Sequence, residues 1–188
     1  MALLFVTGNA NKIAEVRAIL AGAIALETRA LDIPEIQGPS EEIALDKARR
    51  AADIVNGPVL IEDSSLEMNA LNGLPGPYIK PFLETLGNQG LNTLLAGFDD
   101  KSATAVCTFA FSEGRGCEPV LFQGRLEGRI VPPRGPPRFG WEPIFEYQGE
   151  TLAEMEMNKK NGLSHRYRAL VKFQQWFQGS QQVRDIEN

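Results

Sequence analysis

The sequence predicts an α/β fold in which a mixed sheet is flanked by helices. Residues 3–6 form an apolar run that leads through a glycine turn into a helical pattern, and residues 59–61 form a second apolar run after another helical pattern. Strands that alternate with helices are typical of an α/β fold. Residues 103–111 and 120–130 are rich in β-branched and aromatic side chains, which indicates a pair of antiparallel strands.

Composition places the chain among compact globular proteins. With 188 residues, 43% of them hydrophobic and 23% charged, it can bury the core of a single domain spanning residues 1–188. The net charge of −5 argues against nucleic acid and anionic membranes as partners, because both need a basic face. No apolar stretch approaches the roughly 20 residues of a membrane helix, and no secretion signal is evident. We therefore expect a cytoplasmic protein.

Cysteine and histidine usage excludes two further classes. Two cysteines, Cys107 and Cys117, do not make a disulfide framework. A single histidine, His165, nearly excludes zinc sites of the common His/Cys type.

The first strand, Leu3–Val6, ends in a glycine turn over residues 7–12, after which apolar residues recur at helical spacing. Backbone N–H groups at such a helix start can bind an anion, and Lys12 adds a positive charge. Neither the P-loop nor the dinucleotide-binding glycine pattern is present. The alternative interpretation is an ordinary strand-to-helix turn with Asn11 as the helix cap.

A second helix is predicted to begin at Pro39-Ser40-Glu41-Glu42, with Ser40 as its cap, and to end at Gly57-Pro58. The strand at residues 59–61 then places Glu62 and Asp63 at its carboxyl end, where ligands of open α/β sheets bind. Together with Glu35, these carboxylates are oxygen ligands that suit Mg²⁺. The alternative is that they are solvated surface acids, although Asp63 follows an apolar strand.

The middle of the chain predicts a loop and then two short helices. Residues 73–78 contain too many glycines and prolines for regular structure, and residues 79–86 and 91–95 resume a helical pattern. The two strands that follow are predicted to form a long hairpin with its turn at residues 112–119.

A proline-rich loop over residues 132–138 leads into Phe139-Gly140-Trp141-Glu142. Aromatic faces stack on bases, and a carboxylate can accept hydrogen bonds from a base N–H. The alternative is a hydrophobic plug at the end of the loop. Ser164 predicts the cap of a last helix, and the polar residues 179–188 predict a frayed tail.

Four lysines lie in segments with other candidate residues: Lys12, Lys47, Lys80 and Lys160. If they converged they would suit a triphosphate, whose charge must be neutralised in the transition state. The alternative is that each lies on a solvated helix face. Ser164-His165-Arg166 supplies donors at a helix start, and the absence of G-x-S-x-G argues against a serine hydrolase.

Six segments, in order and spanning residues 3 to about 177, together resemble the inosine triphosphate pyrophosphatase family. The segments are Phe5-Val6-Thr7-Gly8-Asn9-Ala10-Asn11-Lys12, Ile33-Pro34-Glu35-Ile36-Gln37-Gly38, Val59-Leu60-Ile61-Glu62-Asp63, Leu74-Pro75-Gly76-Pro77-Tyr78-Ile79-Lys80, Phe139-Gly140-Trp141 and Ser164-His165-Arg166-Tyr167-Arg168-Ala169-Leu170. The resemblance implies an elongated two-lobed fold with a central cleft, and a homodimer. It implies hydrolysis of ITP, dITP and XTP to the monophosphate and pyrophosphate with Mg²⁺, for which Mn²⁺ could substitute.

The resemblance also implies roles for individual residues. Asp63 and Lys12 would be catalytic, and Glu35 and Asp63 would bind the metal. The residues that would hold the triphosphate are Thr7, Gly8, Asn9, Ala10, Asn11, Lys12, Lys47 and Lys80, and Asp63 and Ser64 would also bind the substrate. Those that would bind the base are Phe139, by stacking, and Gly140, Trp141, Glu142, Lys160, His165 and Arg166.

Donors at the base edge would explain selectivity. Hypoxanthine and xanthine carry an oxygen at C6 where adenine carries an amino group, so His165 and Arg166 could donate to the former and would face a donor in the latter. The chain departs from the family's usual Phe-Gly-Trp-Asp at Glu142, whose carboxylate lies one methylene further out.

Two other functions stay open. One is a Maf-like pyrophosphatase for pyrimidine or modified nucleotides, against which Phe139-Gly140-Trp141 and Ser164-His165-Arg166 argue. The other is a sensor that binds a nucleoside triphosphate without cleaving it, against which the acids Glu35 and Asp63 argue.

Overall fold

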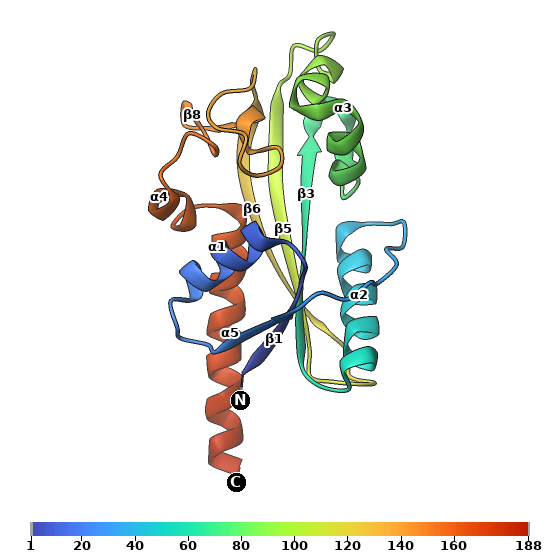
Figure 1. Ribbon diagram of the computed structural model, residues 1–188, viewed down its shortest axis with the longest axis vertical. Helices are drawn as coiled ribbons and strands as arrows, with labels where there is room; N and C mark the ends of the chain where they lie inside the picture. Colours follow the sequence, from blue (N-terminus) through green and yellow to red (C-terminus); the bar gives the residue numbers. More distant parts are fainter. Residues whose placement is uncertain (1, 188) are drawn as a thin grey trace. The chain divides into compact units, whose positions relative to one another are not determined.

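The computed structural model describes the backbone of residues 2–187 and the side chains of residues 2–180, and Figure 1 shows the arrangement of its elements. The strands are β1 (Leu3–Val6), β2 (Leu26–Arg29), β3 (Val59–Met68), β4 (Pro75–Gly76), β5 (Ser102–Ser112), β6 (Val120–Ile130), β7 (Phe145–Tyr147) and β8 (Glu150–Thr151). The helices are α1 (Ala10–Leu20), α2 (Ser40–Val55), α3 (Ile79–Leu94), α4 (Met157–Asn161) and α5 (His165–Glu187), with short 3₁₀ turns η1 (Asn69–Leu71) and η2 (Glu142–Ile144).

The described strands form one sheet in the order β2-β1-β3-β5-β6-β7-β8, with β4 paired to β3. Strand β1 runs parallel to both β2 and β3, whereas the pairs β3–β4, β6–β7 and β7–β8 are antiparallel. The predicted α/β fold with a mixed sheet and flanking helices is confirmed.

The chain divides into two compact units. Unit 1 comprises the residues up to Asp63, Thr108–Gly124 and the residues from Arg166 onward, and unit 2 comprises Ser64–Cys107 and Arg125–His165. Each unit has its own hydrophobic core.

The sheet of unit 1 is covered by α2 on one face and α5 on the other (Figure 1). Small side chains of α2 let the helix approach the strands closely, and the residues in this contact are Ala44, Ala48, Ala51, Ala52, Val6, Val59, Ile61 and Ala110. On the other face Phe173, Trp176 and Phe177 of α5 pack against Phe111 and Phe122. Ala110 and Phe111 are neighbours in β5 and reach opposite helices, because successive strand residues point to opposite faces.

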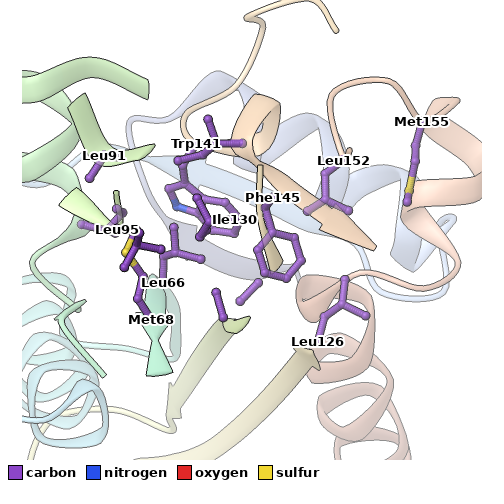
Figure 2. Close-up of a cluster of buried hydrophobic side chains, with 14 residues drawn as sticks. Leu66, Met68, Leu91, Leu95, Leu126, Ile130, Trp141, Phe145, Leu152 and Met155 are labelled. Atoms are coloured by element: carbon purple, nitrogen blue, oxygen red, sulfur yellow. The ribbon is translucent and has the colours of Figure 1, made fainter. Parts of the chain in front are cut away.

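Unit 2 is built around one buried cluster, shown in Figure 2. Leu66 and Met68 of β3, Leu91 of α3 and Phe145 of β7 enclose Trp141, which is only 7% exposed. The ring of Phe145 lies edge-on to Trp141, with the two centroids 5.6 Å apart. The segment that follows the proline-rich loop is therefore anchored in a core through Trp141.

Strand β3 extends beyond the predicted end at Ile61 and reaches Met68, so Glu62 and Asp63 lie inside the strand and not after it. The reason is that its pairing changes partner along its length: Ile61 is the last residue paired with β1, and Leu66 is paired with β4. Glu62 and Asp63 consequently follow the point at which β1, not β3, ends.

Two predicted helix caps were wrong. Asn9, and not Asn11, caps α1, because its Oδ1 accepts hydrogen bonds from the backbone of Asn11 and Lys12. Ser40 is the first residue of α2 and Pro39 takes the cap position without a side-chain hydrogen bond. The sequence reading also missed the short strands β2, β4, β7 and β8, which are too brief to show a clear alternation of polar and apolar residues.

The two predicted helical pieces at residues 79–86 and 91–95 are parts of α3, which is interrupted by non-helical backbone at Gly87. Helix α5 begins directly after Ser164 and continues to Glu187, so most of the predicted tail at 179–188 has helical backbone; Asn188 lies outside the described residues. No helix within the described residues has the length and apolar character to cross a membrane.

Candidate active site

The glycine turn after β1 is organised by Asn9. Its backbone N–H donates to Thr7 Oγ1 (3.1 Å), and its Oδ1 accepts from the backbone N–H groups of Asn11 (3.0 Å) and Lys12 (3.1 Å). Gly8, Asn9, Ala10 and Asn11 are exposed. The backbone N–H groups of Asn11 and Lys12, which the sequence predicted could bind an anion, thus already donate to the helix cap. The other backbone N–H groups of the turn and the Lys12 side chain are the groups that could still bind one.

Lys12 belongs to a network of ion pairs between charged side chains of unit 1. Its ammonium lies 3.3 Å from Glu62 Oε2 and 3.4 Å from the Glu62 carbonyl oxygen. Arg166 Nη2 lies 3.2 Å from Glu62 Oε1, and Arg166 Nη1 is paired with Glu15. The side chains of Arg166, Glu62 and Glu15 are at most 4% exposed. Buried charges are stable only when paired, so the two acids and two bases hold one another in place.

Lys47 of α2 joins the two predicted metal ligands. Its ammonium lies 2.7 Å from Glu35 Oε1 and 3.3 Å from Asp63 Oδ1. Lys47 and Asp63 are largely buried, at 16% and 14% side-chain exposure, whereas Glu35 is 55% exposed. The structure therefore brings together Glu35, Lys47 and Asp63, three residues to which the family resemblance assigns a role.

Burial and charge shift the pKa values of this group. Burial raises the pKa of Asp63, and although the ammonium groups of Lys47 and Lys12 lower it, the net pKa is above its usual value. Burial lowers the pKa of Lys47, but Asp63 and Glu35 outweigh this effect and the net pKa is raised. Lys47 therefore stays an ammonium at neutral pH, and Asp63 accepts a proton more readily than an exposed aspartate does.

The carboxylates of Glu35 and Asp63 fit a magnesium ion whose other coordination positions would be filled by water and substrate. Within the described residues no group of three or more His, Cys, Asp or Glu side chains could hold a metal alone. Mg²⁺ is commonly bound through one or two carboxylates, with waters and substrate phosphates filling its other positions. Glu35 and Asp63, both within reach of one ammonium, match that donor set.

A second group of predicted residues lies in unit 2. Glu142 Oε1 accepts a hydrogen bond from Lys160 Nζ at 2.7 Å, and both side chains are buried. The same ammonium lies 5.7 Å from the centre of the Phe139 ring. The ring of His165 lies beside Trp141, with centroids 5.4 Å apart and planes inclined by 36°. Phe139, Glu142 and Lys160 thus form one contact group, and Trp141 and His165 form another.

The remaining predicted residues are distributed over both units. Lys80 is exposed in the first turn of α3, Ser64 is half-buried in β3, and the carbonyl oxygen of Gly140 accepts a hydrogen bond from Asn88. Arg166 belongs to unit 1, whereas its neighbour His165 belongs to unit 2. The guanidinium assigned to the base edge is thus paired with two carboxylates next to Lys12.

Sequence reasoning missed Glu15 and Asn88. Glu15 lies 151 residues from its partner Arg166, and no local pattern marks a glutamate on the buried side of α1. Asn88 follows the glycine that interrupts α3, and the only signal was the Gly-Asn pair between two helical pieces.

The α/β fold, with lysines and acids beside the glycine turn after β1, is typical of proteins that bind phosphate-containing ligands. The chain belongs to the Ham1 family, which it matches over residues 3–176. It is 63% identical over 180 residues to the inosine triphosphate pyrophosphatase of Aspergillus oryzae, covering 95% of this chain and 94% of the relative.

Solved structures support the same fold. A HAM1 protein from Coxiella burnetii superimposes with a TM-score of 0.84 at 29% identity, covering 95% of this chain and 100% of that one. The nucleoside-triphosphatase / dITP/XTP pyrophosphatase of Mycobacterium abscessus gives a TM-score of 0.71, also at 29% identity, with 92% and 98% covered.

Proposed function

We propose that this protein hydrolyses the non-standard purine nucleoside triphosphates ITP, dITP and XTP to the monophosphate and pyrophosphate, and so removes them from the nucleotide pool. The main support for this proposal is the group formed by Glu35, Lys47 and Asp63, together with Lys12, which is paired with Glu62 and whose charge lowers the pKa of Asp63. It combines positive charge for phosphate oxygens with an acid of raised pKa. Relatives named for this activity share the fold and most of the chain.

In the proposed reaction Asp63 accepts the proton of the attacking water. The water oxygen forms a new bond to phosphorus, the α–β anhydride bond breaks, and pyrophosphate leaves. Lys12 and Lys47 neutralise the charge that develops on the phosphate oxygens. Because Glu62 and Asp63 fix the two ammonium groups beforehand, little reorganisation is needed when a triphosphate binds.

We propose Glu35 and Asp63 as ligands of Mg²⁺, with Mn²⁺ as a substitute. When bound, the ion would supply positive charge to the phosphates and lower the pKa of a water molecule. Support comes from the two carboxylates that share the Lys47 ammonium. With a cation balancing these carboxylates, the Lys47 ammonium could also bind a triphosphate oxygen from its present position.

For the base we propose that Phe139 provides a stacking face and that residues beside it select the purine. Lys160 is held by Glu142 and points its charge at the Phe139 ring, which fixes the ring and its surroundings. The rejection of adenine would come from donors such as His165, which find an acceptor at C6 only in the deaminated purines.

Product analysis over a panel of nucleotides tests the proposal. Purified protein with Mg²⁺ is incubated separately with ITP, XTP, GTP, ATP and dUTP, and the products are separated. We expect monophosphate and pyrophosphate from ITP and XTP, with ATP nearly unchanged. Diphosphate and orthophosphate would contradict the mechanism, preferential turnover of dUTP would favour a Maf-like enzyme, and tight ITP binding without turnover would favour a sensor.

We also propose that the protein is a cytoplasmic homodimer. The family resemblance supports the dimer, and unit 2 exposes several large apolar side chains, among them Leu74, Leu86, Leu94 and Phe98. Light scattering during size-exclusion chromatography tests it, with twice the 20.7 kDa chain mass expected and the single-chain mass contradicting it.

A further inference from the structure

Helix α3 is interrupted at Gly87, one residue before Asn88, whose side chain contacts Gly140. Gly87 has φ 65° and ψ 178°, a left-handed conformation that side chains disfavour, and Asn88 opens the second helical piece. The break changes the direction of the chain between Leu83 on the first piece and Asn88 on the second. Both pieces contribute to the surroundings of Gly140.

Asn88 Nδ2 donates a hydrogen bond of 3.1 Å to the carbonyl oxygen of Gly140. A carbonyl oxygen can only accept, so the amide nitrogen must face it, and the orientation of the Asn88 amide is determined by this contact. Asn88 Oδ1 is buried and has no hydrogen-bond partner within the side chains that the structure describes. An amide that leaves one oxygen unsatisfied has only the Gly140 contact to offset its burial.

The segment Phe139-Gly140-Trp141 is held from several sides. Trp141 and Leu91 belong to the same buried cluster (Figure 2). Leu91 lies three residues after Asn88, hence on the same face of the helix. Leu83 Cδ2 lies 4.0 Å from the position that a Cβ on Gly140 would take. Gly140 itself has φ +54°, a conformation that glycine adopts readily and that a residue with a Cβ disfavours.

We infer that Asn88 is a positioning residue that fixes the backbone of Gly140 and thereby the ring of Phe139 for base recognition. The inference rests on the proposed function, because it needs Phe139 to bind a purine. Asn88 acts through the Gly140 carbonyl oxygen, and it affects binding of the base but not binding of the phosphates. Its loss should therefore weaken binding of a nucleotide and leave binding of a bare triphosphate unchanged.

The test compares two ligands in the presence of Mg²⁺, a non-hydrolysable α,β-methylene analogue of ITP and inorganic tripolyphosphate. Asn88→Asp keeps the shape of the side chain but replaces the donor with a carboxylate that repels the carbonyl. Calorimetry should show affinity for the ITP analogue reduced roughly three- to tenfold, the range expected for one hydrogen bond, with tripolyphosphate affinity unchanged. In turnover the KM for ITP should rise by a similar factor while kcat is preserved.

Gln89→Glu is the matched control, because it makes the same change of charge at the exposed neighbouring position. It should leave the affinity for both ligands at the wild-type value. Asn88→Ala removes the donor without adding charge and should reproduce the effect of Asn88→Asp, which keeps the test valid if the aspartate variant does not fold.

Two results would overturn the role of Asn88 while leaving the proposed function standing. One is an unchanged ratio of the two affinities in both Asn88 variants, and the other is an equal loss for both ligands. Failure of the proposed function is seen separately in the wild-type protein, as ITP that yields no pyrophosphate or an ITP analogue that binds no better than tripolyphosphate.

Discussion

Each lysine assigned to phosphate in unit 1 is already in contact with carboxylate. Lys12 lies against Glu62, and Lys47 lies against Glu35 and Asp63. Such pairs keep the ammonium groups in defined positions without substrate. Because the Lys47–Asp63 pair is largely buried, removing one partner should cost more stability than removing one partner of an exposed pair. The same pairs predict how single substitutions change stability and selectivity.

The contribution of Lys47 to the free energy of unfolding should decrease at alkaline pH. Its pKa is raised in the folded state, so the contribution is complete below the unfolded value of 10.5 and is lost as pH rises through the folded pKa. Lys47→Gln should lower the free energy of unfolding by about 1–3 kcal/mol at pH 7. Urea titrations from pH 7 to 11.5 should show the difference from wild type narrowing above about pH 10.5.

Lys159→Gln is the control for that series, because Lys159 makes an ion pair with Glu150 in which it is 55% exposed. It should change stability by less than about 1 kcal/mol at every pH. A difference for Lys47→Gln that stays constant to pH 11.5 would refute the account of this pair.

Glu142→Asp should change base selectivity more than rate. The shorter side chain withdraws the carboxylate from Lys160, whose ammonium lies over Phe139, and leaves the group around Asp63 untouched. We expect the ratio of kcat/KM for ITP and GTP to change several-fold, on the order of the 10-fold effects that small pocket changes cause, with kcat for ITP nearly constant. Equal losses of kcat/KM for ITP and GTP would contradict this prediction. Glu150→Asp, which shortens the carboxylate of the surface ion pair with Lys159, is the control and should leave the ratio unchanged.

The sequence and the family resemblance selected several residues that the structure brings together, but they did not reveal the partners of all of them. Glu35, Lys47 and Asp63 could be chosen because each lies in a segment with a recognisable pattern, and the structure places them together. Arg166 was assigned to the base edge, although its buried contacts are with Glu15 and Glu62. Pairs separated by more than 100 residues depend on the tertiary fold, which no local spacing reveals.

At the scale of elements, strand β3 determines where the acids lie. The sequence predicted a strand that ended at Ile61, since the apolar run ends there, but the backbone continues because β4 offers a second partner. The acids nevertheless lie beyond the end of β1, as Ile61 is paired with Val6. The prediction that the acids follow the end of their own strand was therefore wrong, and the strand that ends beside them is β1.

The close contact of β6 with β7 predicts a sensitive position at Gly128. A Cβ there would lie 2.4 Å from the carbonyl oxygen of Glu146 and 2.6 Å from the ring of Phe145. Gly128→Ala should reduce the free energy of unfolding by about 1–3 kcal/mol through overpacking. Urea unfolding measures it, with Gly97→Ala, where nothing lies within 4 Å, as the control. Equal stabilities of the two variants would contradict the described packing.

At the scale of the whole molecule, the two units have separate cores and separate groups of candidate residues. Unit 1 carries Lys12, Lys47 and Asp63, and unit 2 carries Phe139 and Lys160. The sequence predicted the mixed α/β class from long apolar runs, and the family resemblance implied two lobes, but no pattern in the residues located the boundary between the two units. The reason is that β3, β5 and β6 each contribute residues to both units, so no linker or change of composition marks a boundary.

Removal of divalent cations should abolish activity without destabilising the protein. Glu35 and Asp63 are two ligands and not a closed set, so a bound ion would be completed by substrate and would add little to folding. With EDTA we expect no ITP turnover, full recovery on adding Mg²⁺ and an unchanged Tm. A Tm lowered by several degrees would indicate a structural metal instead.

ITP turnover by Asp63→Asn, measured together with binding of the non-hydrolysable analogue, decides whether Asp63 activates the attacking water. Asparagine preserves the size of the side chain but cannot accept the proton of the attacking water. Turnover should fall at least about 100-fold while the affinity for the α,β-methylene analogue changes less than about threefold. Asp53→Asn, at an exposed position of α2, should behave as wild type. Wild-type turnover by Asp63→Asn would contradict the proposed role of Asp63.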